Sequence, residues 1–127
     1  MSGVIYLDTH VVAWLYAGKL KLIPINIQNE IANADLLISP IVTLELEYLF
    51  EIGRVSVKGL EVVHDLETRI GLKTCKLPFD SVIKQAIEQR WTRDPFDRII
   101  VSQASIRSSK LVTKDDIIHK NYKHTLW

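Results

Sequence analysis

Residues 4–9 read Val-Ile-Tyr-Leu-Asp-Thr, a run of four apolar residues that ends at an acid and a hydroxyl. A short apolar run without polar alternation is typical of a strand that is buried on both faces of a sheet. The pattern from His10 to Ala17 then indicates a helix, and Gly18 ends it. This strand followed by a helix is the unit from which the rest of the chain is built.

The alternation of short apolar strands and longer helices continues to the end of the chain. We predict further strands at 36–38, 74–77 and 111–113, an edge strand within 123–127, and helices at 24–34, 41–52, 57–70, 81–91 and 96–107, with caps at Ser56, Asp80 and Asp94. Buried strands separated by helices predict a parallel sheet covered on both faces, which is a three-layer α/β/α sandwich with four to five strands. We expect residues 1–127 to form a single domain, because no linker-like stretch interrupts them.

The composition is that of an ordinary globular protein, with 47% hydrophobic and 24% charged residues. It excludes a disordered chain, and no apolar run is long enough for a signal peptide or a membrane span. The single cysteine, Cys75, cannot form an internal disulfide, and we expect a buried thiol in a reducing compartment. These features predict a cytoplasmic protein that makes no membrane contact.

The charge is balanced over the whole chain but not along it. The formal net charge is +1, whereas residues 84–127 carry nine Lys and Arg residues against five acidic residues. This part of the chain could present a basic face to phosphates, although scattered surface charge is the simpler interpretation. Charge alone therefore points to no particular partner.

Acidic residues follow two of the predicted strands or open the helices beside them. They are Asp8 after the first strand, Glu45 in the helix after the second, Asp94 and Asp97 at the start of the helix before the fourth, and Asp115 and Asp116 after the fourth. In an open parallel sheet, chemistry gathers beyond the carboxyl ends of the strands. We therefore expect Asp8, Glu45, Asp97 and Asp115 to meet at one end of the sheet.

Carboxylates that share one site repel one another, and a divalent cation removes the conflict. Oxygen ligands without a His or Cys cluster favour Mg²⁺ or Mn²⁺ over zinc. A metal held in this way lowers the pKa of a water and clamps a phosphodiester for in-line attack. The acids thus predict hydrolysis of a nucleic-acid backbone.

Each acid also has a purely structural interpretation. Asp8 with Thr9 can cap the first helix, and Asp94 before a proline is the best helix cap in the chain. Asp97 can serve the helix dipole alone, Asp115 can cap a short helix over 116–119, and Glu45 can be a surface residue. The hypothesis therefore depends on the acids gathering at one end of the sheet. Trp14 and Tyr16 are assigned to the core or to an interface rather than to base stacking.

Four segments together resemble PIN-domain proteins of the VapC toxin type. They are Asp8-Thr9-His10 after an apolar strand, the stretch from Ser39 to Glu45, Arg93-Asp94-Pro95-Phe96-Asp97-Arg98, and the stretch from Leu111 to Asp115. The order and spacing match across essentially the whole chain, and Arg-Asp-Pro-Phe-Asp-Arg is the most specific piece. The resemblance implies a Rossmann-like sandwich and endoribonuclease activity that depends on Mg²⁺ or Mn²⁺.

The resemblance also assigns roles to individual residues. It places the four metal-binding and catalytic acids of the family on Asp8, Glu45, Asp97 and Asp115, with Thr113 as the small polar residue before the last acid. Thr9, Asp94 and Asp116 are supporting residues, and Asp116 remains an alternative ligand to Asp115. His10, Arg98 and Lys114 are near enough in the pattern to contact RNA phosphates, although surface or capping roles fit them too. The implied partners are an RNA substrate, a small cognate antitoxin whose tail occludes the acidic pocket, and a second copy of the chain.

Three other functions compete with this one. A receiver-like phosphoacceptor domain would need a pair of acids after the first strand and an acceptor acid after a central strand, but Asp8 has no acidic neighbour and Pro78 stands at the second position. A catalytically silent module that only binds RNA or protein would gain nothing from an intact set of repelling acids. A DNA nuclease of the flap type would need more acids and long insertions. The sequence does not reveal which RNA is cleaved.

Overall fold

The computed structural model describes residues 3–127, which contain a five-stranded sheet in the order β3-β2-β1-β4-β5. The strands are β1 (Val4–Leu7), β2 (Asp35–Ile38), β3 (Lys73–Thr74), β4 (Lys110–Val112) and β5 (Thr125–Leu126), and every pairing is parallel. The chain builds β2 and β3 on one side of β1 and then crosses to the other side for β4 and β5. The strand order therefore reverses between β1 and β4. Of the predicted span 1–127, residues 1–2 lie outside the described part.

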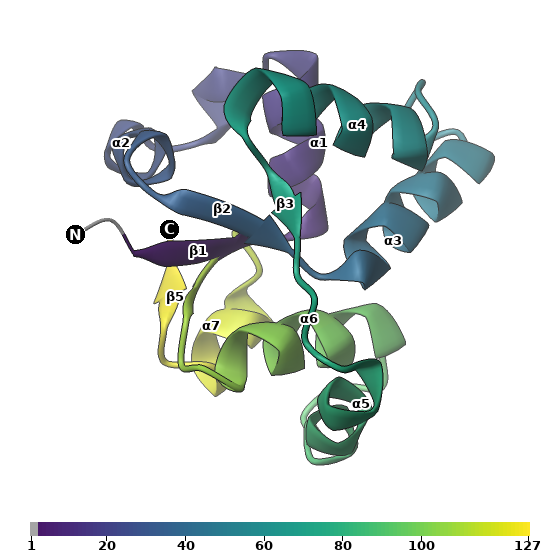
Figure 1. Ribbon diagram of the computed structural model, residues 1–127, viewed down its shortest axis with the longest axis vertical. Helices are drawn as coiled ribbons and strands as arrows, with labels where there is room; N and C mark the ends of the chain where they lie inside the picture. Colours follow the sequence, from purple (N-terminus) through teal and green to yellow (C-terminus); the bar gives the residue numbers. More distant parts are fainter. Residues whose placement is uncertain (1–2) are drawn as a thin grey trace.

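The helices within the described residues cover both faces of the sheet, as the sequence predicts. They are α1 (Thr9–Ala17), α2 (Ile25–Ala32), α3 (Pro40–Glu51), α4 (Gly59–Ile70), α5 (Phe79–Ile87), α6 (Pro95–Ser105) and α7 (Asp116–Asn121), with a 3-10 turn at Leu20–Leu22. Figure 1 shows α1, α2 and α4 above the sheet and α5, α6 and α7 below it. Helix α3 contacts α1 and α4 on one side and α6 on the other. The three-layer α/β/α sandwich is confirmed.

The core is made by the inner faces of these layers. The strand residues Ile5, Leu7, Ile38, Leu111 and Val112 are at most 2% exposed. Cys75 is a free buried thiol, as predicted, and accepts a 3.0 Å hydrogen bond from the Tyr6 hydroxyl. None of the helices within residues 3–127 has the length and apolar character that a membrane span requires.

Several predicted element boundaries differ from the structure, and three of the differences change how an element begins or ends. The predicted strand at 74–77 is only Lys73–Thr74, because the chain leaves the sheet once the Cys75 amide has bonded to the Ile38 carbonyl. The predicted helix at 81–91 begins at Phe79 behind Pro78, so Asp80 lies in its first turn instead of capping it. The predicted helix at 57–70 begins at Gly59, and Ser56 is not its cap.

The start of α4 is instead capped by another helix. The Glu47 carboxylate on α3 accepts a 3.0 Å hydrogen bond from the Gly59 amide. A Cβ atom at Gly59 would lie 2.5 Å from the Thr43 carbonyl oxygen and 2.9 Å from the Glu47 amide nitrogen. Only glycine lets the two helices approach this closely, because overpacking a close contact costs about 1–3 kcal/mol.

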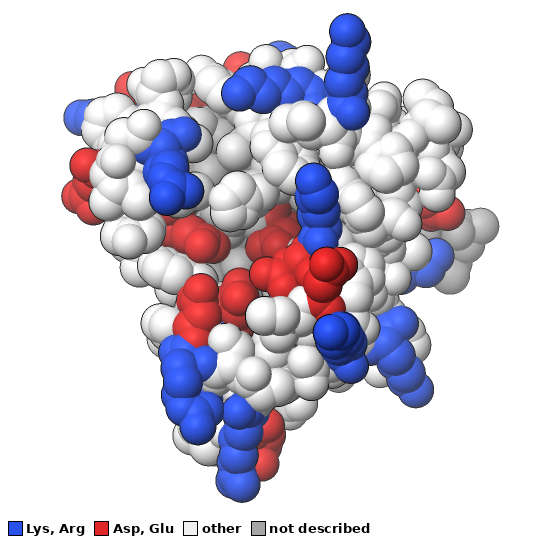
Figure 2. All heavy atoms as spheres, turned by 180° about the vertical axis from the view of Figure 1, so that it is seen from behind, with Lys and Arg blue, Asp and Glu red and all other residues white. Residues whose placement is uncertain are grey.

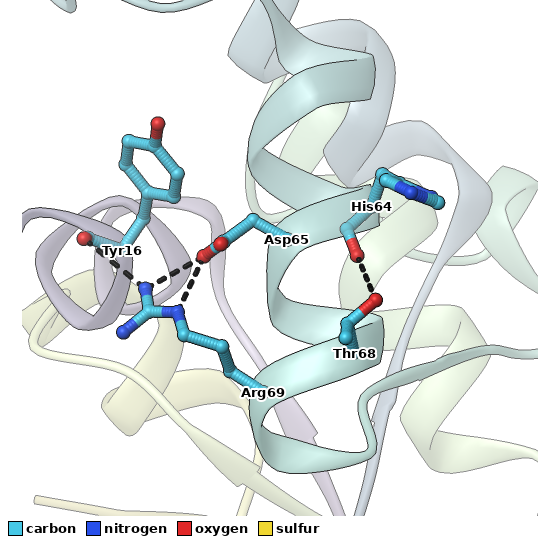
Figure 3. A network of polar contacts seen from close by, with 5 residues as sticks. All are labelled: Tyr16, His64, Asp65, Thr68 and Arg69. Atoms are coloured by element: carbon cyan, nitrogen blue, oxygen red, sulfur yellow. Dashed lines mark hydrogen bonds and ion pairs between the residues drawn. The ribbon is translucent and has the colours of Figure 1, made fainter.

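A polar contact joins α4 to the end of α1 (Figure 3). The Arg69 guanidinium lies 2.6 Å from the Asp65 carboxylate one turn earlier on α4, and it also donates to the Tyr16 carbonyl at 3.4 Å. A cation at the last turn of a helix interacts favourably with the helix dipole. Arg69 therefore ties α4 to the C-terminal end of α1.

Candidate active site

The centre of the candidate site lies where the strand order reverses, between the ends of β1 and β4. Asp8 directly follows β1, and its amide donates to the Val112 carbonyl at 3.0 Å. The Thr113 hydroxyl, just beyond β4, donates to Asp8 Oδ2 at 2.5 Å, while the Thr9 amide donates to Asp8 Oδ1 at 2.8 Å. Asp8 is only 8% exposed. The two donors hold its carboxylate in one orientation. It caps α1 and also faces the site.

Glu45 reaches the same place from α3. The Thr9 hydroxyl donates to Glu45 Oε1 at 2.5 Å, which links the start of α1 to the first turns of α3. The start of α3 is fixed in turn from the opposite layer, because the Ser39 hydroxyl donates to Gln103 Oε1 on α6 at 2.9 Å. Glu45 is therefore a positioned residue and not a free surface acid.

Three further acids approach from the starts of α6 and α7. Asp94 caps α6 through hydrogen bonds from the amides of Phe96 and Asp97, and Asp97 lies half-buried in the first turn of that helix. Asp115 caps α7, and its own amide donates to the Thr113 hydroxyl at 3.1 Å. Asp94 and Asp115 can therefore cap their helices and still meet at the site, because both capped helix ends lie at the same end of the sheet.

These carboxylates line one cavity of about 430 Å³ at that end. Its lining residues are Asp8, His10, Val11, Trp14, Glu45, Asp94, Asp97, Lys114 and Asp115. Figure 2 shows acidic side chains around a hollow near the middle of this face, with Lys and Arg side chains standing about it. The structure therefore brings together all four acids that the sequence singled out.

The electrostatics of this cavity are those of crowded negative charge. Burial, followed by the carboxylates of Asp94, Asp8, Asp115 and Glu45, raises the pKa of Asp97 to about 7. Burial also raises the pKa of Asp8 and of Glu45, against the lowering effect of the threonine hydroxyls that bond to them. A cation in the cavity would remove this repulsion and favour the ionised carboxylates.

A profile of the PIN domain matches residues 5–124. The chain belongs to the PIN domain family. Three solved structures share the fold of this PIN domain. VapBC2 from Rickettsia felis, bound to a DNA fragment from their promoter, has 16% sequence identity and a TM-score of 0.67, covering 97% of this chain and 96% of that one.

PAE2754 from Pyrobaculum aerophilum has 20% identity and a TM-score of 0.59, covering 99% of this chain and 91% of that one. FitAB bound to an IR36 DNA fragment has 15% identity and a TM-score of 0.52, covering 97% of this PIN domain and 93% of that chain. Among curated proteins, no sequence matches this one. PIN domains are generally nucleases, so the family agrees with the chemistry that the acids suggest.

The donor set of this PIN domain fits a hydrated divalent ion. Within residues 3–127, no three His, Cys, Asp or Glu side chains stand close enough together to hold an ion by direct ligation alone. Mg²⁺ retains several waters and needs only one or two direct carboxylates, so a cavity of this size with oxygen donors on its walls suits it. Burial, together with the neighbouring carboxylates, raises the pKa of Asp8, Glu45 and Asp97, and a nearby cation would act in the opposite direction on these carboxyls.

The remaining predicted residues separate into two groups. His10 and Lys114 are exposed side chains that line the cavity. Arg98 is outside the cavity lining and donates from Nε to the Thr92 carbonyl at 2.9 Å, which ties down the segment before α6. Among the described residues that line the cavity, Asp115 is present and Asp116 is not.

Sequence reasoning missed two features of this PIN domain site. His119 Nε2 donates to the Thr113 carbonyl at 2.6 Å, and Nδ1 lies 2.7 Å from the Thr125 hydroxyl, so α7 links the site to β5. Trp14, assigned to the core or an interface, packs partly on the core but also forms a wall of the cavity. No signal in the sequence gives the first contact, whereas Trp14 stands four residues after His10, on the same face of the predicted helix, and this spacing hints at the second.

Proposed function

We propose that this PIN domain is an endoribonuclease that depends on Mg²⁺ or Mn²⁺ and acts as the toxin of a VapBC-type toxin–antitoxin pair. One observation carries the nuclease assignment: carboxylates from four separate segments share one cavity in which burial and mutual repulsion raise the pKa of Asp97 to about 7. The likeness to chains of VapBC2 and FitAB, which are named as pairs, supports the toxin role.

In this proposal Asp8, Glu45, Asp97 and Asp115 hold the metal, partly through waters. A bound Mg²⁺ or Mn²⁺ would lower the pKa of a water molecule and neutralise charge on the scissile phosphate. Thr113 keeps the Asp8 carboxylate in place and at the same time orients the backbone before Asp115. The Thr9 hydroxyl likewise holds the Glu45 carboxylate in place, so Thr9 and Thr113 are both positioning residues.

The supporting residues then act at the edges of the cavity. Asp94 stabilises the start of α6 and adds negative charge beside Asp97. His10 and Lys114 stand exposed in the cavity lining, where the imidazole N–H and the ammonium can contact RNA phosphates. Asp116 and Arg98, which do not line the cavity, have supporting structural roles.

The proposal includes the partners and the setting of the protein. Residues 1–127 form one domain that works in the cytoplasm, cleaves RNA, binds a small cognate antitoxin and forms a homodimer. The antitoxin assignment draws on the paired names of the structural neighbours. The homodimer and the RNA substrate rest on the resemblance to VapC toxins alone.

Cleavage of mixed RNAs with Mn²⁺ tests the proposal. Asp8→Asn and Asp97→Asn should each reduce the cleavage rate by about 100-fold or more, because metal-assisted charge stabilisation is worth several kcal/mol. Glu61→Gln is the matched control, since Glu61 is an exposed acid on α4 outside the cavity lining. Calorimetric Mn²⁺ titration provides a readout that does not depend on the choice of RNA. If the wild type and the three variants are equally inactive and bind no Mn²⁺, the nuclease proposal is wrong and the protein is a binding module without catalytic activity.

A further inference from the structure

A second hollow adjoins the acidic cavity on the α1 side. It has a volume of about 650 Å³ and lies between α1, α3, the 53–57 loop and α4; we call it the α1–α4 groove. Apolar side chains of α3 and α4, including Leu46, Leu49 and Val62, line it. His10 and Trp14 line both hollows and so form the wall that they share.

The charge of the α1–α4 groove is opposite to that of the cavity beside it. Its basic lining residues are His10, Lys19 and Arg54, and none of the described residues that line it is an Asp or Glu. All three side chains are exposed. Gly53, with a φ of 78°, ends α3 and turns the chain so that Arg54 enters the groove. A polyanion that occupied the metal site could therefore continue into the groove without meeting further negative charge.

Trp14 stands at the junction of the two hollows. Its ring is half-buried and makes two tilted ring contacts, with centroids 6.3 Å from His10 and 5.9 Å from Trp127. These tilted contacts hold the indole in one orientation, and Tyr16 adds a second aromatic residue to the groove. A fixed aromatic ring beside basic side chains is the usual means of binding single-stranded nucleic acid, because every base has a face that can stack.

We propose that Trp14 stacks on an unpaired base of the RNA next to the cleaved phosphate, and that Lys19 and Arg54 bind the phosphates of the strand that continues along the α1–α4 groove. This inference rests on the proposed ribonuclease function and names the single-stranded form of its substrate. Arg69 on α4 bonds to the end of α1, so it fixes the positions of these two helices on either side of the groove.

Binding of two labelled RNA pentamers in EDTA, followed by fluorescence anisotropy, tests the stacking. One is pentauridylate, and the other has the same sugar–phosphate backbone without bases. Wild-type protein should bind pentauridylate more tightly than the abasic pentamer. Trp14→Leu should weaken pentauridylate binding by about 5- to 100-fold and leave abasic binding unchanged, in line with stacking energies of about 1–3 kcal/mol per base. Trp14→Phe keeps an aromatic face and should restore part of the difference.

Trp91→Leu is the matched control, because Trp91 is a half-buried indole that lines neither hollow. Thermal melting of each variant shows whether it is folded. Arg54→Gln should weaken both pentamers alike and reduce the salt slope by about 0.7, the value for one phosphate contact on a single strand. If wild-type protein binds both pentamers equally, or if Trp14→Leu behaves as Trp91→Leu does, the proposal is overturned.

The two proposals fail in distinguishable ways. A wild-type protein that shows the base-dependent binding but cleaves no RNA with Mn²⁺ would refute the nuclease and retain the stacking site. Cleavage that is lost in Asp8→Asn but unaffected by Trp14→Leu, with equal pentamer binding, would refute the stacking site and retain the nuclease. In that case the apolar lining of the groove would suit a protein helix instead.

Discussion

The acidic cavity and the α1–α4 groove share His10 and Trp14 but differ in every other respect. The cavity is built from strand ends and helix caps, and its carboxylates repel one another. The groove is built from helix sides and one loop, and its charged side chains are basic. In the proposed ribonuclease, the cavity would hold the metal that activates a water, and the groove would bind the charge of the phosphodiester chain. This division of roles would let a protein with a net charge of +1 act on a polyanion without a large basic face.

The largest expected effect comes from the Thr113 hydroxyl, which fixes Asp8 in the acidic cavity. Its removal should weaken metal binding in the cavity and leave RNA binding in the groove unchanged. Thr113→Val keeps the side-chain shape but removes the bond to Asp8 and the acceptor for the Asp115 amide. We expect Mn²⁺ affinity, measured by calorimetry, to fall by about 10- to 100-fold, as for other residues that orient metal ligands. Pentamer binding in EDTA should not change.

Thr68→Val is the control for this substitution. The Thr68 hydroxyl bonds only to the His64 carbonyl on the exposed side of α4, as Figure 3 shows. It should leave Mn²⁺ affinity at the wild-type value. An equal loss in both variants would mean that Thr113 does not act through Asp8.

A smaller effect should appear in the pH dependence of stability. The pKa of Asp97 is raised from an ordinary 3.8 to about 7, so the folded protein binds this proton more tightly than the unfolded chain does. The stabilising contribution is complete below about pH 4 and is lost as the pH rises through 7. The Tm of the metal-free protein should therefore be lower at pH 8 than at pH 5, measured by thermal melting.

Two variants separate the cavity from the groove in this experiment. Asp97→Asn has no proton to lose, so its Tm should fall less between pH 5 and pH 8. Arg54→Gln, in the α1–α4 groove, should show the full wild-type fall. Saturating Mn²⁺ should raise the Tm more at pH 8 than at pH 5, because protons compete with the metal for the carboxylates. A Tm that falls equally in Asp97→Asn would locate the titrating group elsewhere.

The smallest effect should come from the contact between α4 and α1. Arg69→Ala removes an exposed ion pair with Asp65 and the bond to the Tyr16 carbonyl. Urea denaturation should show a loss of at most about 1 kcal/mol, because exposed ion pairs contribute little. Pentamer affinity should fall modestly and Mn²⁺ affinity should stay the same. A larger effect on Mn²⁺ than on the pentamer would show that the two hollows are not independent.

The sequence predicts the acidic cavity well because its signals are local. Asp8 follows an apolar run, Asp94 precedes a proline, and Asp115 follows another strand, so each is placed by its own neighbours in the chain. The parallel sheet then brings these positions to one edge, which is a general property of the fold class. The strand order could not be read in this way, because it depends on which strands pair across long separations.

Two of the features that sequence reasoning missed depend on contacts between distant residues. The start of α4 was misplaced because its cap is Glu47 on α3, a residue that looks like an ordinary surface acid. The second is the contact of the Trp14 ring with Trp127 at the far end of the chain. Local propensity carries no information about either contact, since only the packed structure creates them.

The hydrogen bond between Asp8 and Thr113 joins residues that are 105 positions apart in the chain. It can therefore form only late in the synthesis of the protein. Because β1 lies in the middle of the sheet, its second neighbour β4 is synthesised long after it. While the chain is still being made, β1 can pair with β2 but Asp8 has no Thr113 beside it, and long-range pairing of this kind forms late. If the proposed function holds, the nascent polypeptide would therefore lack a complete acidic cavity until Thr113 and Asp115 have emerged and β4 has paired with β1.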